Sequence, residues 1–205
     1  MAQIAEDLFL LLLDNSSGAP ALEPQRRQRV LAAAVLLDLA HACRVRPAVP
    51  GEPYPAGHLV ALTGVSPLDP VTGPAFDVLL RRPLPPAGAL AKLRKHTEAH
   101  VVRQLEQSAA LPIVVRDRVE PARAAVLAAL FDRAAPTPPT AAIICLLHAV
   151  DGLGALLSLN DRGWRWVHAR AGEISLGSWL DEQPTGLPEV NLAVTASALR
   201  PALSA

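Results

Sequence analysis

The chain contains the stretch Ala142-Ile143-Ile144-Cys145-Leu146-Leu147-His148-Ala149-Val150-Asp151-Gly152-Leu153, which decides its fold class. As a helix, this stretch would be apolar on nearly every side, which is typical of a helix that other helices surround. We therefore predict a central helix over Thr140–Ser158. The run from Val30 to Leu39, interrupted only by Asp38, predicts a second central helix within a segment from Glu23-Pro24 to about Ala42.

The composition supports the same fold class. Of 205 residues, 51% are hydrophobic and 20 are proline. Alanine and leucine favour helix, and prolines mark the joints between short helices because they are disfavoured in helix interiors. We expect a mainly α fold, with one globular helical domain over residues 1–205, buried central helices and short β-hairpins.

Local signals predict the other elements. Short strands are expected at Val45–Val49 and His58–Thr63, around a turn at Gly51–Pro55, and a further brief strand at Ile113–Arg118. Further helices are expected at Ala87–Ala109, Pro121–Arg133, Arg162–Arg170 and Leu187–Leu199.

Charge and apolar runs exclude several classes of protein. The formal net charge is zero, which argues against a nucleic-acid binder. The longest apolar run, Ala141–Val150, is well short of the ~20 residues needed to span a bilayer. Glu6 and Asp7 stand where a signal peptide carries positive charge. We therefore expect a cytoplasmic protein in which Cys43 and Cys145 are reduced, packed thiols.

Sequence motifs of the common enzyme classes are missing. The chain has no Gly-x-Ser-x-Gly, no phosphate-binding Gly-x-x-x-x-Gly-Lys and no Cys-x-x-Cys. His96 and His100 share a helix face, but no third metal ligand is evident and the glutamate of the zinc-protease pattern is displaced. We expect no metal, no cofactor and no catalytic residue.

The predicted helix over Ala87–Ala109 has a basic face. On a helical wheel its basic residues fall in one wedge of roughly 140°, opposite an apolar face. These residues are Lys92, Lys95, His96, His100 and Arg103. The face predicts a surface that binds anions, although solvated surface helices are also commonly charged.

A second basic cluster begins the helix that follows Glu23. Arg26, Arg27 and Arg29 lie in its first turns, where positive charge opposes the helix dipole. An anion bound to these arginines and to free N–H groups would make the arrangement favourable. The alternative is that Glu23 offsets the arginines and nothing binds at this helix end.

Trp164 and Trp166 are two residues apart, so they cannot both face inward on a helix. One of them is then exposed, as at a membrane interface. A core ring beside a partly covered ring explains the pattern equally well.

Three segments together resemble the Golgi phosphoprotein 3 family, whose bacterial members are common. They are Ala5–Asp14, Leu36–Val45 with the pattern Leu-Leu-Asp-Leu-Ala-His-Ala-Cys-Arg-Val, and Ala142–Leu153 with Leu-His-Ala-x-Asp. The Ala/Pro-rich composition, with arginine in place of most lysines, also looks bacterial. The resemblance implies a helical, peripheral membrane protein whose eukaryotic relatives recognise phosphatidylinositol 4-phosphate and adapt other proteins to the membrane.

The family's headgroup pocket implies particular positions in this chain. It uses a tryptophan before the second helix, and this chain has Leu22-Glu23 at that place. It also uses an arginine within that helix. The corresponding position in this chain is near Ala32, and Arg29 lies one turn earlier. Of its Arg-x-x-Arg on the long helix, Lys95 matches the first and Glu98 occupies the second.

The family also inserts an apolar hairpin into the bilayer. The corresponding hairpin, expected after Ile113–Arg118, carries Arg116, Asp117 and Arg118.

Three functions remain open at this point. The first is a non-enzymatic binder of anionic lipid headgroups on the inner face of the cytoplasmic membrane, using Arg26, Arg29, Lys92, Lys95, His96 and Arg103. The second is a protein-interaction module that keeps the family fold without lipid binding. The third is a metal-dependent enzyme built on His96 and His100.

Overall fold

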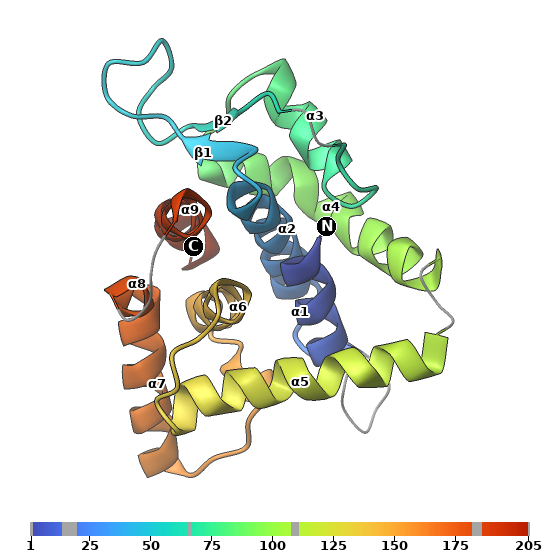
Figure 1. Cartoon of the computed structure of the whole chain (residues 1–205), viewed down its shortest axis with the longest axis vertical. Helices are drawn as coiled ribbons and strands as arrows, with labels where there is room; N and C mark the ends of the chain where they lie inside the picture. The colour runs from blue at the N-terminus through green and yellow to red at the C-terminus, as the bar shows by residue number, and fades with distance from the viewer. Residues whose placement is uncertain (1, 14–19, 65–66, 108–110, 182–185, 205) are drawn as a thin grey trace.

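The computed structural model describes residues 2–13, 20–64, 67–107, 111–181 and 186–204, with the backbone alone at 111–117 and 181. The fold is a mainly helical single domain with one short antiparallel hairpin in the described part (Figure 1). In chain order the elements are α1 Gln3–Leu13, α2 Pro24–His41, β1 Val45–Pro47, β2 Leu59–Ala61, α3 Gly73–Arg81, α4 Pro86–Gln107, α5 Leu111–Phe131, α6 Pro138–Ala149, the 3-10 turn η1 Leu153–Ala155, α7 Asp161–Ser175, α8 Ser178–Asp181 and α9 Leu187–Ser204.

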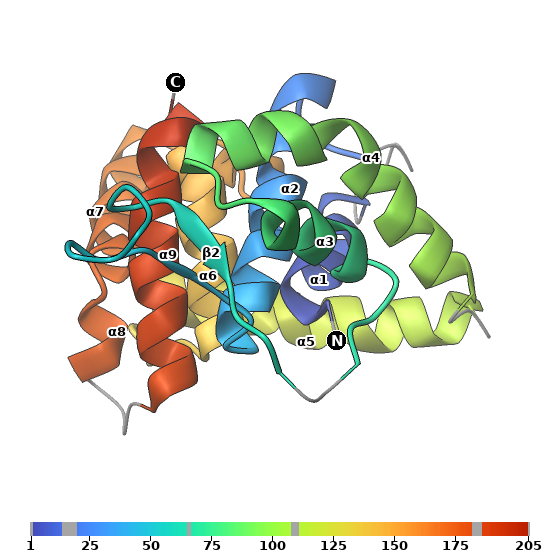
Figure 2. The same ribbon diagram turned by 90° about the horizontal axis from the view of Figure 1, so that it is seen from above.

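The two helices predicted to be central are central. Every residue of α2 from Val30 to Ala40 is buried, and α6 buries Thr140–Ile144 together with Leu146 and Leu147. Helix α2 packs against α1, α4, α6 and α9. Figure 2 shows α4 along one side of this group and α5 along the opposite side. The buried part of α2, which is apolar on nearly all sides, is therefore covered by other helices on all its faces.

The predicted hairpin is confirmed between β1 and β2. Val45 pairs with Ala61, and Pro47 pairs with Leu59. The backbone of Leu59 also exchanges hydrogen bonds with Leu84, just before α4 begins. The hairpin therefore fixes the start of α4 against the end of α2.

The strand predicted at Ile113–Arg118 is wrong, and so is the hairpin expected after it. This segment is the beginning of α5, which continues through Pro121. Arg118 donates to Glu6 Oε2 at 2.7 Å and to Asp7 Oδ1 at 2.5 Å, holding α5 across α1. Tertiary contacts of this kind override a short β-branched run and the loss of one helical hydrogen bond at proline.

The central helix α6 ends nine residues earlier than predicted. Asp151 adopts a left-handed backbone conformation with φ at +51°, and Gly152 N donates to Leu147 O at 2.7 Å. This is a common way for a helix to end, with an aspartate in place of the usual glycine or asparagine. Gly152 and Gly154 consequently lie after the helix rather than within it.

Asp38, the one polar residue in the apolar run of α2, organises the N-terminus of α1. Its Oδ1 accepts a hydrogen bond from Ile4 N at 2.9 Å, and its Oδ2 accepts one from Ala5 N at 3.0 Å. These N–H groups belong to the first turn of α1, where a helix has no backbone partners of its own. Asp38 therefore joins the two helices through a buried carboxyl group.

Candidate functional site

Helix α4 presents the basic face that the sequence predicts. Its inward side is buried through Ala89, Leu90, Leu93, Thr97, Val101 and Leu105. Lys92, Lys95, His96 and Arg103 are exposed, whereas His100 is half-buried. None of these side chains forms an ion pair with another residue in the described part of the chain. The positive charges of Lys92, Lys95 and Arg103 are therefore directed into solvent.

One flank of this face borders α3. Lys92, His96 and His100 lie beside Val78 and Ala75 around a depression of about 140 Å³. Burial lowers the pKa of His100, and the nearby charges of Arg103 and His96 add to that effect. His100 therefore gains its charge only at more acidic pH than an ordinary histidine, and Lys92 carries the constant charge beside the depression.

The other flank of α4 meets the start of α2. Arg27 Nε donates to Glu98 Oε1 at 2.9 Å, and the same guanidinium donates to Leu22 O at 3.1 Å. Figure 2 shows α4 lying between the start of α2 and α3. Lys95 is one helical turn before Glu98, so it lies toward the α2 flank.

The predicted site residues thus lie in two groups, one on each flank of α4. Lys95 lies on the side of α2, which carries Arg26 and Arg29, whereas Lys92 and His96 border α3. Among the described residues, no hydrogen bond or ion pair joins the side chain of Arg26 or Arg29 to α4. The two basic segments are neighbours on adjacent helices rather than one closed pocket.

Glu23 already occupies the N-terminus of α2. Its carboxylate accepts hydrogen bonds from Gln25 N at 3.0 Å and Arg26 N at 3.2 Å. The bond from Gln25 lowers the pKa of Glu23, and the bond from Arg26 and the charges of Arg26 and Arg29 act in the same direction. The expectation that free N–H groups here would hold a bound anion is therefore corrected, because Glu23 is that anion. Arg26 remains exposed and Arg29 partly exposed.

We expect the Arg27–Glu98 pair to contribute to stability. Both side chains are largely covered, with 14% and 23% exposed. A double-mutant cycle with Arg27→Met and Glu98→Gln should give a favourable coupling energy of about 1 kcal/mol in urea unfolding. Arg27→Met alone should cost more than Glu98→Gln because Arg27 also bonds to Leu22 O. Arg26→Met is the matched control, and a coupling energy of zero would contradict the pairing.

The two tryptophans differ in exposure, as expected. Trp166 is 41% exposed and stacks on Phe131 with ring centroids 5.8 Å apart. Trp164 is partly buried and its ring lies 5.7 Å from that of His168. Phe131 is the last residue of α5 and Trp166 belongs to α7, and Figure 1 shows α7 on the far side of the fold from α4.

Metal-ligand clusters and membrane-spanning helices are both missing from the part of the chain that the structure describes. No group of three or more His, Cys, Asp or Glu side chains is placed to hold a metal ion within the described ranges. No helix in the same ranges has the length and apolar content needed to cross a membrane.

Sequence reasoning missed the role of Glu98 and the partnership of Arg27. The two residues are 71 positions apart, so no local pattern connects them. The opposite charges of Arg27 and Glu98 would indicate an ion pair only to a reader who already knew that α2 and α4 are neighbours.

Comparison with known proteins adds one finding. Residues 4–185 match the sequence model of the family described as Golgi phosphoprotein 3 (GPP34). No curated protein matches the chain.

Proposed function

The chain belongs to the Golgi phosphoprotein 3 family, and from this premise we propose that it is a non-enzymatic peripheral membrane protein that binds anionic phospholipid headgroups. The family consists generally of non-catalytic lipid-binding proteins. The proposed headgroup resembles phosphatidylinositol 4-phosphate, and the proposed location is the inner face of the cytoplasmic membrane. The proposed binding residues are Arg26, Arg29, Lys92, Lys95, His96 and Arg103.

The observation that supports this proposal most is the unpaired positive charge on α4. Elsewhere in the described part of the chain, Arg27, Arg46 and Arg118 each contact a carboxylate. Lys92, Lys95 and Arg103 have no such partner there. Each cation near an anionic membrane contributes about 1 kcal/mol, so three or four acting together give a partition of about 10² to 10³. Binding of that strength is reversible adsorption.

The departures from the family's pocket bear on specificity. Ala32 is fully buried, so an arginine could not be accommodated at that position without disturbing the core. Glu98, at the second position of the family's Arg-x-x-Arg, is bonded to Arg27. The proposal therefore assigns recognition of a phosphomonoester to Lys95, Arg26 and Arg29, which lie toward the junction of α2 and α4.

Co-sedimentation with vesicles tests the proposed function. The full chain is mixed with neutral phosphatidylcholine vesicles, with vesicles containing phosphatidylglycerol, and with vesicles containing phosphatidylinositol 4-phosphate. We expect binding to both acidic compositions, weakened by salt because exposed charges are screened. Equal binding to neutral and acidic vesicles, or binding insensitive to salt, contradicts the proposal. A preference for the phosphoinositide at equal surface charge supports the finer assignment.

The exposed rings of Phe131 and Trp166 favour a second candidate function. Aromatic side chains are enriched at protein interfaces, and here two of them form an exposed stacked pair. On this alternative the protein is an adaptor that binds another protein through α5 and α7. Reversing the charge of Lys95 and Arg103 would then leave partner capture unchanged, whereas Trp166→Ala would abolish it.

A further inference from the structure

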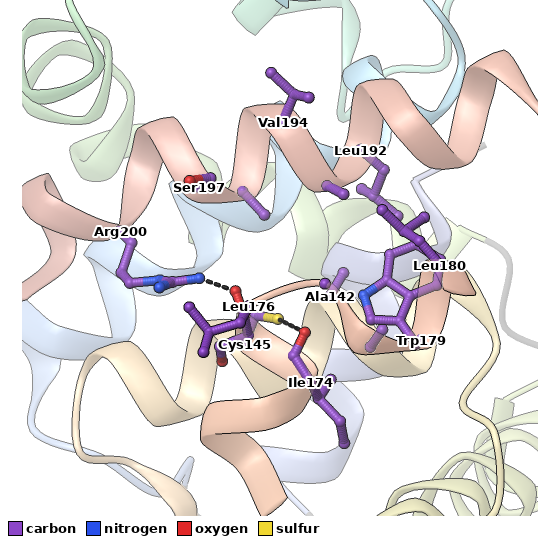
Figure 3. Close-up of a pocket in the computed structure, with 15 residues that line it drawn as sticks. Ala142, Cys145, Ile174, Leu176, Trp179, Leu180, Leu192, Val194, Ser197 and Arg200 are labelled. Atoms are coloured by element: carbon purple, nitrogen blue, oxygen red, sulfur yellow. Dashed lines mark hydrogen bonds between the residues drawn. The ribbon is translucent and has the colours of Figure 1, made fainter. Parts of the chain in front are cut away.

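A cavity of about 260 Å³ lies among α6, α7, α8 and α9 (Figure 3). Small side chains line it, among them Ala142 and Cys145 on α6 and Ala193 and Ala196 on α9. Larger apolar side chains at these positions would fill the space between the helices. The volume is slightly below the range of about 300–1,000 Å³ that is typical of small-molecule sites.

The two ends of the cavity differ in chemistry. Figure 3 shows Arg200 at one end and Trp179 with Leu180 at the other. Arg200 is the one charged residue among the described residues that line it. Burial raises the pKa of the Cys145 thiol, so that side chain stays uncharged and acts as part of the apolar lining. The cavity is therefore mainly apolar, with a single cation at one end.

Arg200, like the partly buried Arg44 and Arg123, donates to a backbone oxygen. Arg27, Arg118 and Arg170 each donate to a glutamate. Arg200 donates to the backbone oxygen of Ser175 and forms no ion pair with any described residue. A guanidinium has five N–H donors, and a planar carboxylate is its best-matched acceptor. A carboxylate that the fold does not provide would complete this end of the cavity.

The mouth of the cavity exposes apolar surface. Leu176 is 82% exposed and Val194 is 51% exposed, and both line the cavity. A ligand that covers exposed apolar surface gains about 25 cal/mol of free energy for each Å² removed from water. An alkyl chain would cover both side chains and fill the space behind them.

We propose that this cavity binds a single-chain anionic amphiphile of the fatty-acid class. Its carboxylate would sit on Arg200, and its alkyl chain would run along α6 and α9 toward Trp179. The described residues that line the cavity belong to α6, α7, α8, α9 and the turns between them, and none of them lies on α4, which carries the basic face. The site is consequently independent of headgroup binding.

Titration calorimetry with decanoate tests this site. We expect saturable one-to-one binding to the full chain. Arg200→Gln should weaken it about tenfold or more, because a charge-assisted pair is lost. Arg200→Lys should retain part of the affinity because it keeps the positive charge. Ala196→Leu should abolish binding by filling the cavity. Arg165→Gln, an exposed arginine of α7 outside the cavity, is the charge-matched control and should bind as the wild type does.

A second measurement locates the ligand. The chain has two cysteines, so Cys43→Ser leaves Cys145 as the sole thiol. Saturating decanoate should slow alkylation of Cys145, and the same concentration of decyltrimethylammonium should not. Absence of saturable decanoate binding overturns the proposal, as does binding that Arg200→Gln and Ala196→Leu both leave unchanged. A vesicle result of either sign leaves this test intact, because neither Arg200 nor Cys145 belongs to the α4 surface.

Discussion

Replacement of Asp38 with alanine is expected to lower the free energy of unfolding by about 2–4 kcal/mol. The change leaves Ile4 N–H and Ala5 N–H without their acceptor at fully buried residues. An unsatisfied buried donor costs about 1–3 kcal/mol, and two are created here. Urea unfolding followed by circular dichroism measures the effect. Asp77→Ala, at an exposed position of α3, is the control and should stay within about 0.5 kcal/mol of the wild type.

Asp38 also makes stability depend on pH. Burial raises the pKa of its carboxyl group from 3.8 to about 8, and the hydrogen bonds from Ile4 and Ala5 only partly oppose this. Between about pH 4 and 8 the folded protein therefore holds a proton that the unfolded chain has released. Stability must fall as pH rises through this window, because the unfolded state binds fewer protons.

Asp38→Asn separates this effect from other titrating groups. Asparagine approximates the neutral acid and does not ionise. We expect the stability of the wild type, relative to Asp38→Asn, to fall steadily from pH 4 to pH 8. A difference that stays constant or rises over this range would show that Asp38 is ionised in the folded protein.

The two central helices could be predicted from the sequence because an apolar run is a local pattern. Val30–Leu39 and Ala142–Leu147 are apolar on all sides, and only burial among other helices satisfies such a pattern. The role of Asp38 within that run was not predictable in the same way. Its hydrogen-bond donors are 33 and 34 residues away, on α1. A buried polar residue indicates that some partner exists but does not identify it.

The error at Ile113–Arg118 has a different origin. A β-branched run followed by Pro121 has the local features of a strand and then a helix start. Helix α5 instead passes through both, supported by contacts with α1, α6 and α7. Proline removes one backbone bond, and the ion pairs of Arg118 lie three residues before it. Local propensity is a weak guide where long-range contacts are this specific.

The basic face of α4 was predictable because a helical wheel needs no tertiary information. Which carboxylates approach it was not predictable, because Glu23 acts within α2 and Glu98 bonds across helices. Arg200 gave no signal at all in the sequence, since the cavity beside it depends on the packing of four helices. The roles of the basic face of α4 and of Arg200 can be assigned only when the neighbouring helices are known.

The largest functional effect is expected from removing the constant charges of α4. The triple variant Lys92→Gln, Lys95→Gln, Arg103→Gln should bind acidic vesicles about 10²-fold more weakly than the wild type. All three side chains are exposed, so the helix should fold as before. Co-sedimentation across vesicle concentrations measures the partition, and a shallower dependence on salt should accompany the loss.

A control variant with the same change in net charge tests whether vesicle binding depends on where the positive charges lie. Arg133→Gln, Arg162→Gln, Arg165→Gln removes three exposed positive charges from the region of α5 and α7. A specific α4 surface predicts near wild-type binding for this control, because exposed charges beyond about 10 Å are largely screened at physiological salt. Equal losses in both triple variants would mean that net charge alone governs adsorption, and the headgroup site on α4 would have to be abandoned. Loss confined to the α4 variant, together with unchanged decanoate binding, would assign membrane contact to α4 and leave the cavity of α6–α9 as a separate site.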